Sequence, residues 1–175
     1  MKVEKCIVYR IVNCDVEVKE GAPALPSKWK ALEDYKKCIE ETLERHRPNG
    51  LPRRDNCLYV CFSKENAYEW AYIKYWKKDT PYKLLTLEIK GELYWFIADY
   101  YNLLGDKFTH KQLDKACKDY WNSMTENSND LMLDKGYEGL FVGEAIVKTI
   151  EYKNYINGES VDVEYENMVS IWQTM

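Results

Sequence analysis

The chain has 175 residues, of which 46% are apolar and 31% are charged, which suits one soluble domain with a real hydrophobic core. Its formal net charge of −4 argues against nucleic-acid binding through an overall basic field and leaves only local basic clusters for such a role. No run of about 18 apolar residues occurs, so we expect no membrane-spanning segment.

Cysteine and histidine usage bounds the possible chemistry. None of the six cysteines forms a C-x-x-C pair, and neither His46 nor His110 lies at ligand spacing from them. We therefore expect no zinc site. The chain opens on an apolar strand rather than a signal peptide, so we expect a cytoplasmic protein with reduced thiols.

Hydrophobic periodicity predicts alternating strands and helices over most of the chain. The expected N-caps of the three helices are Ser27, Ser63 and Thr109. The predicted elements are strand 5–12, helix 27–47, strand 57–62, helix 63–78, strand 82–91 continuing into 92–104, and helix 109–124.

The last quarter of the chain is predicted to contain strands only. They cover 138–143, 145–156 and 160–173, and the last two form a hairpin with Asn157-Gly158 at its turn. Because helices come early and strand pairs come late, the fold class is α+β, a single domain over 1–175 with a mostly antiparallel sheet. No glycine-rich turn follows the first strand, which excludes a P-loop or a dinucleotide fingerprint.

Three positions are candidates for chemistry. Arg10, beside Tyr9, lies within an apolar strand, where it either faces water or turns inward to bind phosphate or ribose groups. Ser63 either caps its helix or orients a bound ribose or carboxamide. Glu138 lies two residues before the apolar run 140–142. A carboxylate there, in a cleft, could stabilise a developing cation or accept a proton, although an exposed strand-end glutamate is the simpler interpretation.

Taken together, "VYRIV", "LYVCFSKENAYEWA" and "YEGLFVGEAIV" resemble, in order and separation, the motifs of the ADP-ribosyltransferase superfamily. The third segment is also similar to the region around the catalytic glutamate of poly-ADP-ribose polymerases. The resemblance implies a split antiparallel sheet with flanking helices, NAD as substrate and no metal. It implies NAD contacts from Tyr9, Arg10, Ser63, Tyr68 or Tyr72, with Glu138 assisting nicotinamide departure.

The chain departs from the family pattern at two places. Cys61-Phe62-Ser63 replaces the frequent Ser-Thr-Ser, and Gly136 stands where arginine-modifying members carry Glu or Gln. A second register, in which "KGYEGLFV" is the preceding strand, makes Glu166 the catalytic acid. Glu144 is the third candidate.

The acceptor of the transferred group stays open. Arg53 and Arg54, expected in a loop, could contact NAD phosphates or a nucleic-acid backbone, and exposed aromatic rings could stack on unpaired RNA or DNA bases. The acidic net charge favours a protein acceptor. The resemblance points to a toxin or a phage-conflict effector, which implies an inhibitory partner protein in a toxin–antitoxin pair. An NAD glycohydrolase and a catalytically inactive binding module are the alternatives.

Overall fold

Strands and helices alternate through the first part of the chain. The computed structural model describes residues 1–26, 34–75, 80–104, 107–127, 131, 135–156 and 159–164. The elements are β1 (Lys2–Asn13), α1 (Asp34–Arg45), the 3-10 helix η1 (Arg54–Asn56), β2 (Leu58–Val60), α2 (Lys64–Tyr75), β3 (Tyr82–Ile97), α3 (Asp99–Asn102), α4 (His110–Asn122), β4 (Tyr137–Ile156) and β5 (Glu159–Asp162). No helix of these described residues is long and apolar enough to cross a membrane.

A five-stranded sheet has the order β1-β3-β4-β2, and β5 pairs with β4. β2 runs antiparallel to β4 with Leu58 opposite Phe141, and β5 runs antiparallel to β4 with Ile156 opposite Glu159. The predicted α+β class with an antiparallel sheet is therefore confirmed, as is the last hairpin. Its turn residues, 157–158, lie outside the described residues.

The chain divides into two compact units. Unit 1 comprises Met1–Val3, Leu25–Val60 and Gly91–Gly143, and unit 2 comprises Glu4–Ala24, Cys61–Lys90 and Glu144–Met175. β3 and β4 are long enough to contribute to both. Each unit is described below by itself.

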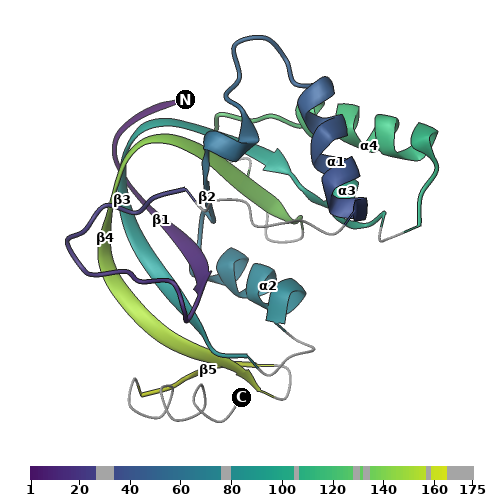
Figure 1. The fold of residues 1–175 in the computed structure, drawn as a ribbon. Coiled ribbons are helices and arrows are strands. Elements are labelled where there is room, and N and C mark those ends of the chain that lie inside the picture. The colour runs from purple at the N-terminus through teal and green to yellow at the C-terminus, as the bar shows by residue number, and fades with distance from the viewer. Residues whose placement is uncertain are drawn as a thin grey trace. The chain divides into compact units, whose positions relative to one another are not determined.

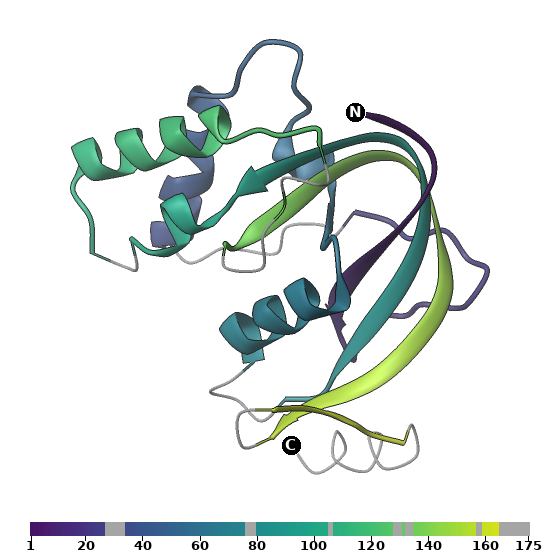
Figure 2. The same cartoon turned by 180° about the vertical axis from the view of Figure 1, so that it is seen from behind.

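In unit 2, α2 packs on strand residues through its small side chains. β1, β3 and β4 lie side by side here (Figure 1), and Figure 2 shows the same strands and α2 from behind. Ala67 and Ala71 are fully buried one turn apart and leave room for larger neighbours. Their cluster also contains Cys61, Tyr82 and Leu84, with Tyr9, Ile11, Tyr68 and Trp70 packed against it.

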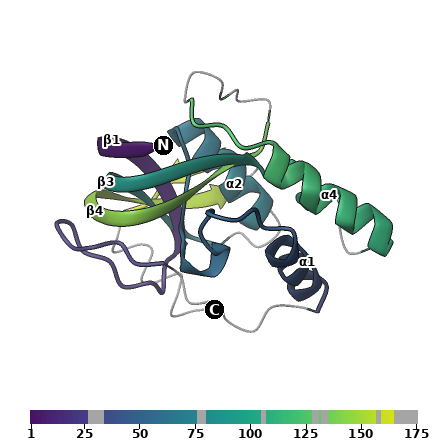
Figure 3. The same cartoon turned by 90° about the horizontal axis from the view of Figure 1, so that it is seen from above.

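In unit 1, α1 and α4 lie side by side (Figure 3). Trp121 of α4 donates from Nε1 to the carbonyl oxygen of Leu43 on α1 at 2.8 Å. The rings of Phe96 and Tyr120 stack with centroids 4.8 Å apart, and Trp121 meets Phe96 edge-on at 5.2 Å. Tyr120 connects this aromatic core to the polar residues described below, because its hydroxyl donates to Glu138.

β4 is one strand, although the sequence predicted separate strands at 138–143 and 145–156. Gly143 lies within it at φ 147°, and Gly91 of β3 has φ 155°. A Cβ on Gly91 would overlap the Val142 carbonyl oxygen and lie 2.8 Å from the Gly143 Cα. Gly91 thus permits the close approach of β4 at this point, and Gly143 lies within β4 rather than ending a strand.

The other predicted elements agree with the structure within the described residues. Strand 82–91 continues to Ile97 before α3 begins, as expected. The predicted helix 27–47 is present from Asp34 to Arg45, whereas Ser27 lies outside the described residues. β5 ends at Asp162, and residues 165–175 are likewise outside them.

Thr109 caps α4 as predicted, in a capping box. Its Oγ1 accepts from the backbone N–H of Gln112 at 3.3 Å, and the Gln112 side chain accepts from the Thr109 N–H at 2.8 Å. We expect Thr109→Ala to lower the free energy of unfolding by about 1 kcal/mol, because the Gln112 N–H loses its acceptor. Urea unfolding measures the change. Thr109→Ser keeps the hydroxyl and should behave as wild type, and equal losses in both variants would contradict the cap.

Candidate functional site

Glu138 and Arg54 form a buried ion pair in unit 1. Glu138 is the second residue of β4, and Arg54 opens η1 just before β2. Only 5% of Glu138 and 3% of Arg54 are exposed. Because an unpaired charge at this depth would be strongly destabilising, the two groups must be held together by well-aligned neighbours.

Both carboxylate oxygens of Glu138 accept hydrogen bonds. Oε1 accepts from Arg54 Nη1 and from the Tyr120 hydroxyl, the latter at 2.6 Å. Oε2 accepts from the Tyr101 hydroxyl at 3.0 Å. Oε1 therefore has two donors and Oε2 has one, which leaves Oε2 with the larger remaining capacity to accept.

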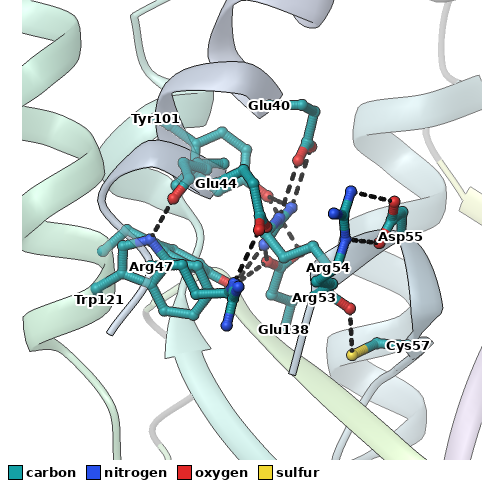
Figure 4. Close-up of polar contacts among 12 residues, drawn as sticks. Glu40, Glu44, Arg47, Arg53, Arg54, Asp55, Cys57, Tyr101, Trp121 and Glu138 are labelled. Atoms are coloured by element: carbon teal, nitrogen blue, oxygen red, sulfur yellow. Dashed lines mark hydrogen bonds and ion pairs between the residues drawn. The ribbon is translucent and has the colours of Figure 1, made fainter. Parts of the chain in front are cut away.

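Arg54 is shared between two carboxylates. Its Nε and Nη2 donate to the two oxygens of Glu40 on α1, at 3.0 and 3.2 Å, in a bidentate arrangement (Figure 4). Its guanidinium carbon lies 5.2, 5.3 and 5.0 Å from the ring centroids of Tyr59, Tyr101 and Tyr120. The three rings enclose the cation, so the cluster combines ion pairing with cation–π contacts.

The charges of the cluster shift the pKa values of its members. Burial alone would lower the pKa of Arg54, but Glu138 and the tyrosines raise it well above its usual value. Burial raises the pKa of Glu40, and Arg54 offsets part of that shift. Burial also keeps the pKa values of Tyr101 and Tyr120 well above 10.0. One buried cation thus faces two carboxylates, and the tyrosines remain neutral donors.

Two buried thiols near the cluster are not activated. Burial raises the pKa of Cys57 and of Cys117 to about 12, with Arg54 opposing the shift in both. A thiolate is therefore not available there near neutral pH. Among the described residues, no group of three or more His, Cys, Asp or Glu side chains is placed to hold a metal ion.

A pocket of about 340 Å³ gives access to one side of the cluster. Glu40 is its partly buried wall, with 19% of the side chain exposed, and Arg54 lies behind it. Its lining combines carboxylates and cations: Lys37, Glu40, Glu41, Glu44, Arg53, Arg54 and Asp55. A polar ligand entering the pocket would meet Glu40 first and Glu138 only through the Arg54 guanidinium.

The two adjacent arginines have different environments. Arg53 is exposed and makes two hydrogen bonds to Asp55, at 3.1 and 2.9 Å, so an external anion that reached it would compete with Asp55. Arg54 was expected in a loop, from where it could reach a phosphate. It is instead buried by the carboxylates and rings around it, and we assign it to the cluster rather than to an acceptor surface.

The remaining predicted residues of β1 and α2 belong to unit 2. Tyr9 pairs with Cys61 through backbone hydrogen bonds of 2.9 and 2.7 Å. Arg10 points into the protein, with 7% exposed, and burial lowers its pKa to about 10. Ser63 accepts from the Asn66 N–H at 3.1 Å, which confirms its predicted capping role.

Two aromatic candidates lie on α2. Tyr68 packs against the unit 2 core with its ring 5.6 Å from Lys153 Nζ, whereas Tyr72 is 48% exposed. Of the competing acids, Glu144 is exposed on β4, and Glu166 lies outside the described residues.

Glu40, Tyr101 and Tyr120 were not identified from the sequence. Tyr120 follows Leu113 and Cys117 on the apolar face of α4, a spacing that predicts burial. A buried tyrosine hydroxyl requires a partner, and that requirement was the available signal. Nothing local marks Glu40 as a partner of Arg54, because the two are 14 residues apart and meet only in the folded unit.

Removing the buried Arg54 cation should destabilise the folded protein. We expect Arg54→Met to lower the free energy of unfolding by about 3–5 kcal/mol, because Glu138 and Glu40 lose their counter-charge inside the protein. Arg53→Met is the matched control, being exposed, and should leave stability unchanged. Urea unfolding of both variants tests this, and equal small losses would mean that the ion pair is not buried as described.

Tyr59 offers a test by pH. Burial raises its pKa well above 10.0, and its hydroxyl has no hydrogen-bond partner among the described residues. Above pH 10 the unfolded chain releases this proton while the folded protein keeps it, so stability falls with rising pH. We expect Tyr59→Phe to match wild-type stability at pH 7 and to make this alkaline decline shallower by about 1.4 kcal/mol per pH unit. An unchanged slope in urea titrations at several pH values would contradict the assignment.

A family model described as "Protein of unknown function (DUF2441)" matches residues 15–170. The match covers most of the 175 residues, so the chain belongs to this family. It contains the whole Arg54–Glu138 cluster and begins after Arg10. None of the curated proteins compared with the chain matches it.

Proposed function

We propose that this member of the DUF2441 family is an NAD-dependent mono-ADP-ribosyltransferase, a toxin or phage-conflict effector that modifies a macromolecular acceptor and releases nicotinamide. The observation that carries the proposal is the position of Glu138. It is the second residue of β4, which pairs antiparallel with β2, and its carboxylate is ion-paired and hydrogen-bonded. The resemblance to ADP-ribosyltransferases assigns the acid to such a strand start, in a split sheet.

In the proposed reaction, the bond between the nicotinamide nitrogen and the ribose anomeric carbon breaks, and its electron pair leaves with nicotinamide. The Glu138 carboxylate stabilises the resulting cation and accepts a hydrogen bond from the ribose 2′-hydroxyl, best through Oε2. Because Glu138 is 5% exposed, the ribose must displace the Tyr101 hydroxyl to reach it. A nucleophile of the acceptor then bonds to the anomeric carbon and loses its proton to solvent.

The proposal gives the residues of unit 2 the task of holding NAD. Arg10 is the candidate for a phosphate or ribose because a guanidinium can bind such groups bidentately, and with 7% exposed it must become accessible before NAD can reach it. The Ser63 hydroxyl already accepts the capping hydrogen bond from Asn66. To orient the nicotinamide end it must use its second lone pair or its O–H. Tyr72, with its exposed ring, is better placed for stacking than Tyr68, which packs into the core.

A binding module without catalysis is the second candidate. The observation in its favour is that Arg54, Tyr101 and Tyr120 already donate to the Glu138 carboxylate within the protein. In that case the ion pair is structural, and the pocket beside Glu40 would bind a ligand without transforming it.

The test is release of nicotinamide from NAD by the purified protein, with and without cell lysate. We expect release only with lysate, because the transferase needs an acceptor. Glu138→Gln should reduce turnover at least about 100-fold while NAD still binds, because the amide keeps the size but loses the charge that stabilises the cation. Glu4→Gln is the matched control, since the Glu4 side chain is 87% exposed.

Each outcome separates the candidates. Loss of turnover in Glu166→Gln, with wild-type rates in Glu138→Gln, would transfer the catalytic role to Glu166. Release without lysate would identify a glycohydrolase. No release, together with no NAD binding in calorimetry, would leave the binding module. Thermal unfolding of each variant shows whether lost turnover reflects chemistry or loss of the fold.

A further inference from the structure

One exposed face of unit 1 is basic although the whole chain is acidic. Lys111, Lys115 and Lys118 are exposed on α4, and Arg45 at the end of α1 is 66% exposed in its side chain. Tyr100 on α3 is 42% exposed, and α3 packs against α4. We call these five residues, Arg45, Tyr100, Lys111, Lys115 and Lys118, the α4 surface.

The three lysines form a row along the helix. They are four and three residues apart, the spacing that places side chains on one face, and at about 1.5 Å of rise per residue they follow each other at about 6 and 4.5 Å along the axis. Phosphates along a nucleic-acid strand also recur at regular short intervals. A row of flexible ammonium groups can follow such a strand without a fixed register.

Two acidic residues border the row, and both are engaged by basic neighbours. Asp114 accepts from His46 at 2.9 Å and lies 4.0 Å from Arg45. Asp119 pairs with Lys115 at 2.5 Å. The four basic residues of the α4 surface therefore exceed these two acids by two charges, whereas the chain carries −4. The local field attracts anions despite the overall charge.

Tyr100 adds a feature that a purely electrostatic surface lacks. α3 packs against α4, the helix that carries the lysine row, and the Tyr100 ring on α3 is 42% exposed. An exposed ring beside a cationic track is the combination that binds unpaired bases by stacking while lysines bind the phosphates. A duplex would hide its bases from Tyr100.

We propose that the α4 surface binds single-stranded nucleic acid, which would be the acceptor of the proposed transferase. The role as acceptor rests on the proposed function, whereas binding itself does not require catalysis. An acidic protein would satisfy the lysines but gives no reason for the exposed ring beside them.

The experiment measures fluorescence anisotropy of labelled single-stranded RNA and DNA about 16 nucleotides long, with the full chain and without NAD. We expect binding whose affinity falls as salt rises from about 50 to about 200 mM. The variant Lys111→Gln/Lys115→Gln/Lys118→Gln should bind at least about tenfold more weakly, and its log–log salt slope should be shallower by about 2, at about 0.7 per lost phosphate contact. Tyr100→Ala should weaken binding with little change in slope, and Tyr100→Phe should keep it.

The matched control is Lys2→Gln/Lys5→Gln/Lys90→Gln, which removes three other exposed lysines and should bind as wild type. Equal affinity of wild type and the α4 variant would overturn the inference, as would equal binding of duplex and single strand. Equally tight binding of an acidic peptide that competes for the site would point to a protein partner instead and would also overturn it.

The same experiment distinguishes this inference from the proposed function. Glu138→Gln should bind the oligonucleotides as wild type, because its carboxylate is buried away from solvent. Oligonucleotide binding without any nicotinamide release would reject the transferase and keep the surface. Lysate-dependent release that survives nuclease but not protease would keep the transferase and reject nucleic acid as its acceptor.

Discussion

The burial of Arg54 is the constraint on which unit 1 depends. A guanidinium with 3% exposure is tolerable only if counter-charges and acceptors surround it, and each of its partners comes from a different element. Glu40 comes from α1, Tyr101 from α3, Tyr120 from α4 and Glu138 from β4. These elements must therefore take their places together, because any one missing partner leaves a buried charge partly unsatisfied.

The hydrogen bonds that Glu138 accepts also limit how its carboxylate could contact a ligand. A carboxylate fixed by three donors is held in one orientation. It is also shielded, and Oε2, bound only by Tyr101, is the side from which it could be approached. Glu40 is the more accessible carboxylate and faces the pocket, although the sequence directed attention to Glu138, Glu166 and Glu144 instead.

Local sequence signals predicted the helices and strands well. The differences between prediction and structure come from contacts between residues far apart in the sequence. Thr109 and Ser63 cap their helices as expected because capping depends on residues three positions away. Arg53 and Arg54 look alike in the sequence, yet one is exposed and the other buried, since the difference is made by residues 14 to 84 positions distant. The sequence predicted a strand end at Gly143. The structure continues the strand, and the contact with Gly91 of β3 that explains the glycine cannot be recognised from local sequence.

The close approach of β3 and β4 also has an evolutionary consequence. At Gly91 the space of a side chain is filled by the backbone of residues 142–143, so a mutation there cannot be absorbed by a rotamer change. It would be tolerated only if the opposite strand moved away, which β4 could do by acquiring a bulge. Position 91 should consequently stay glycine unless the backbone opposite it, at residues 142–143, changes as well.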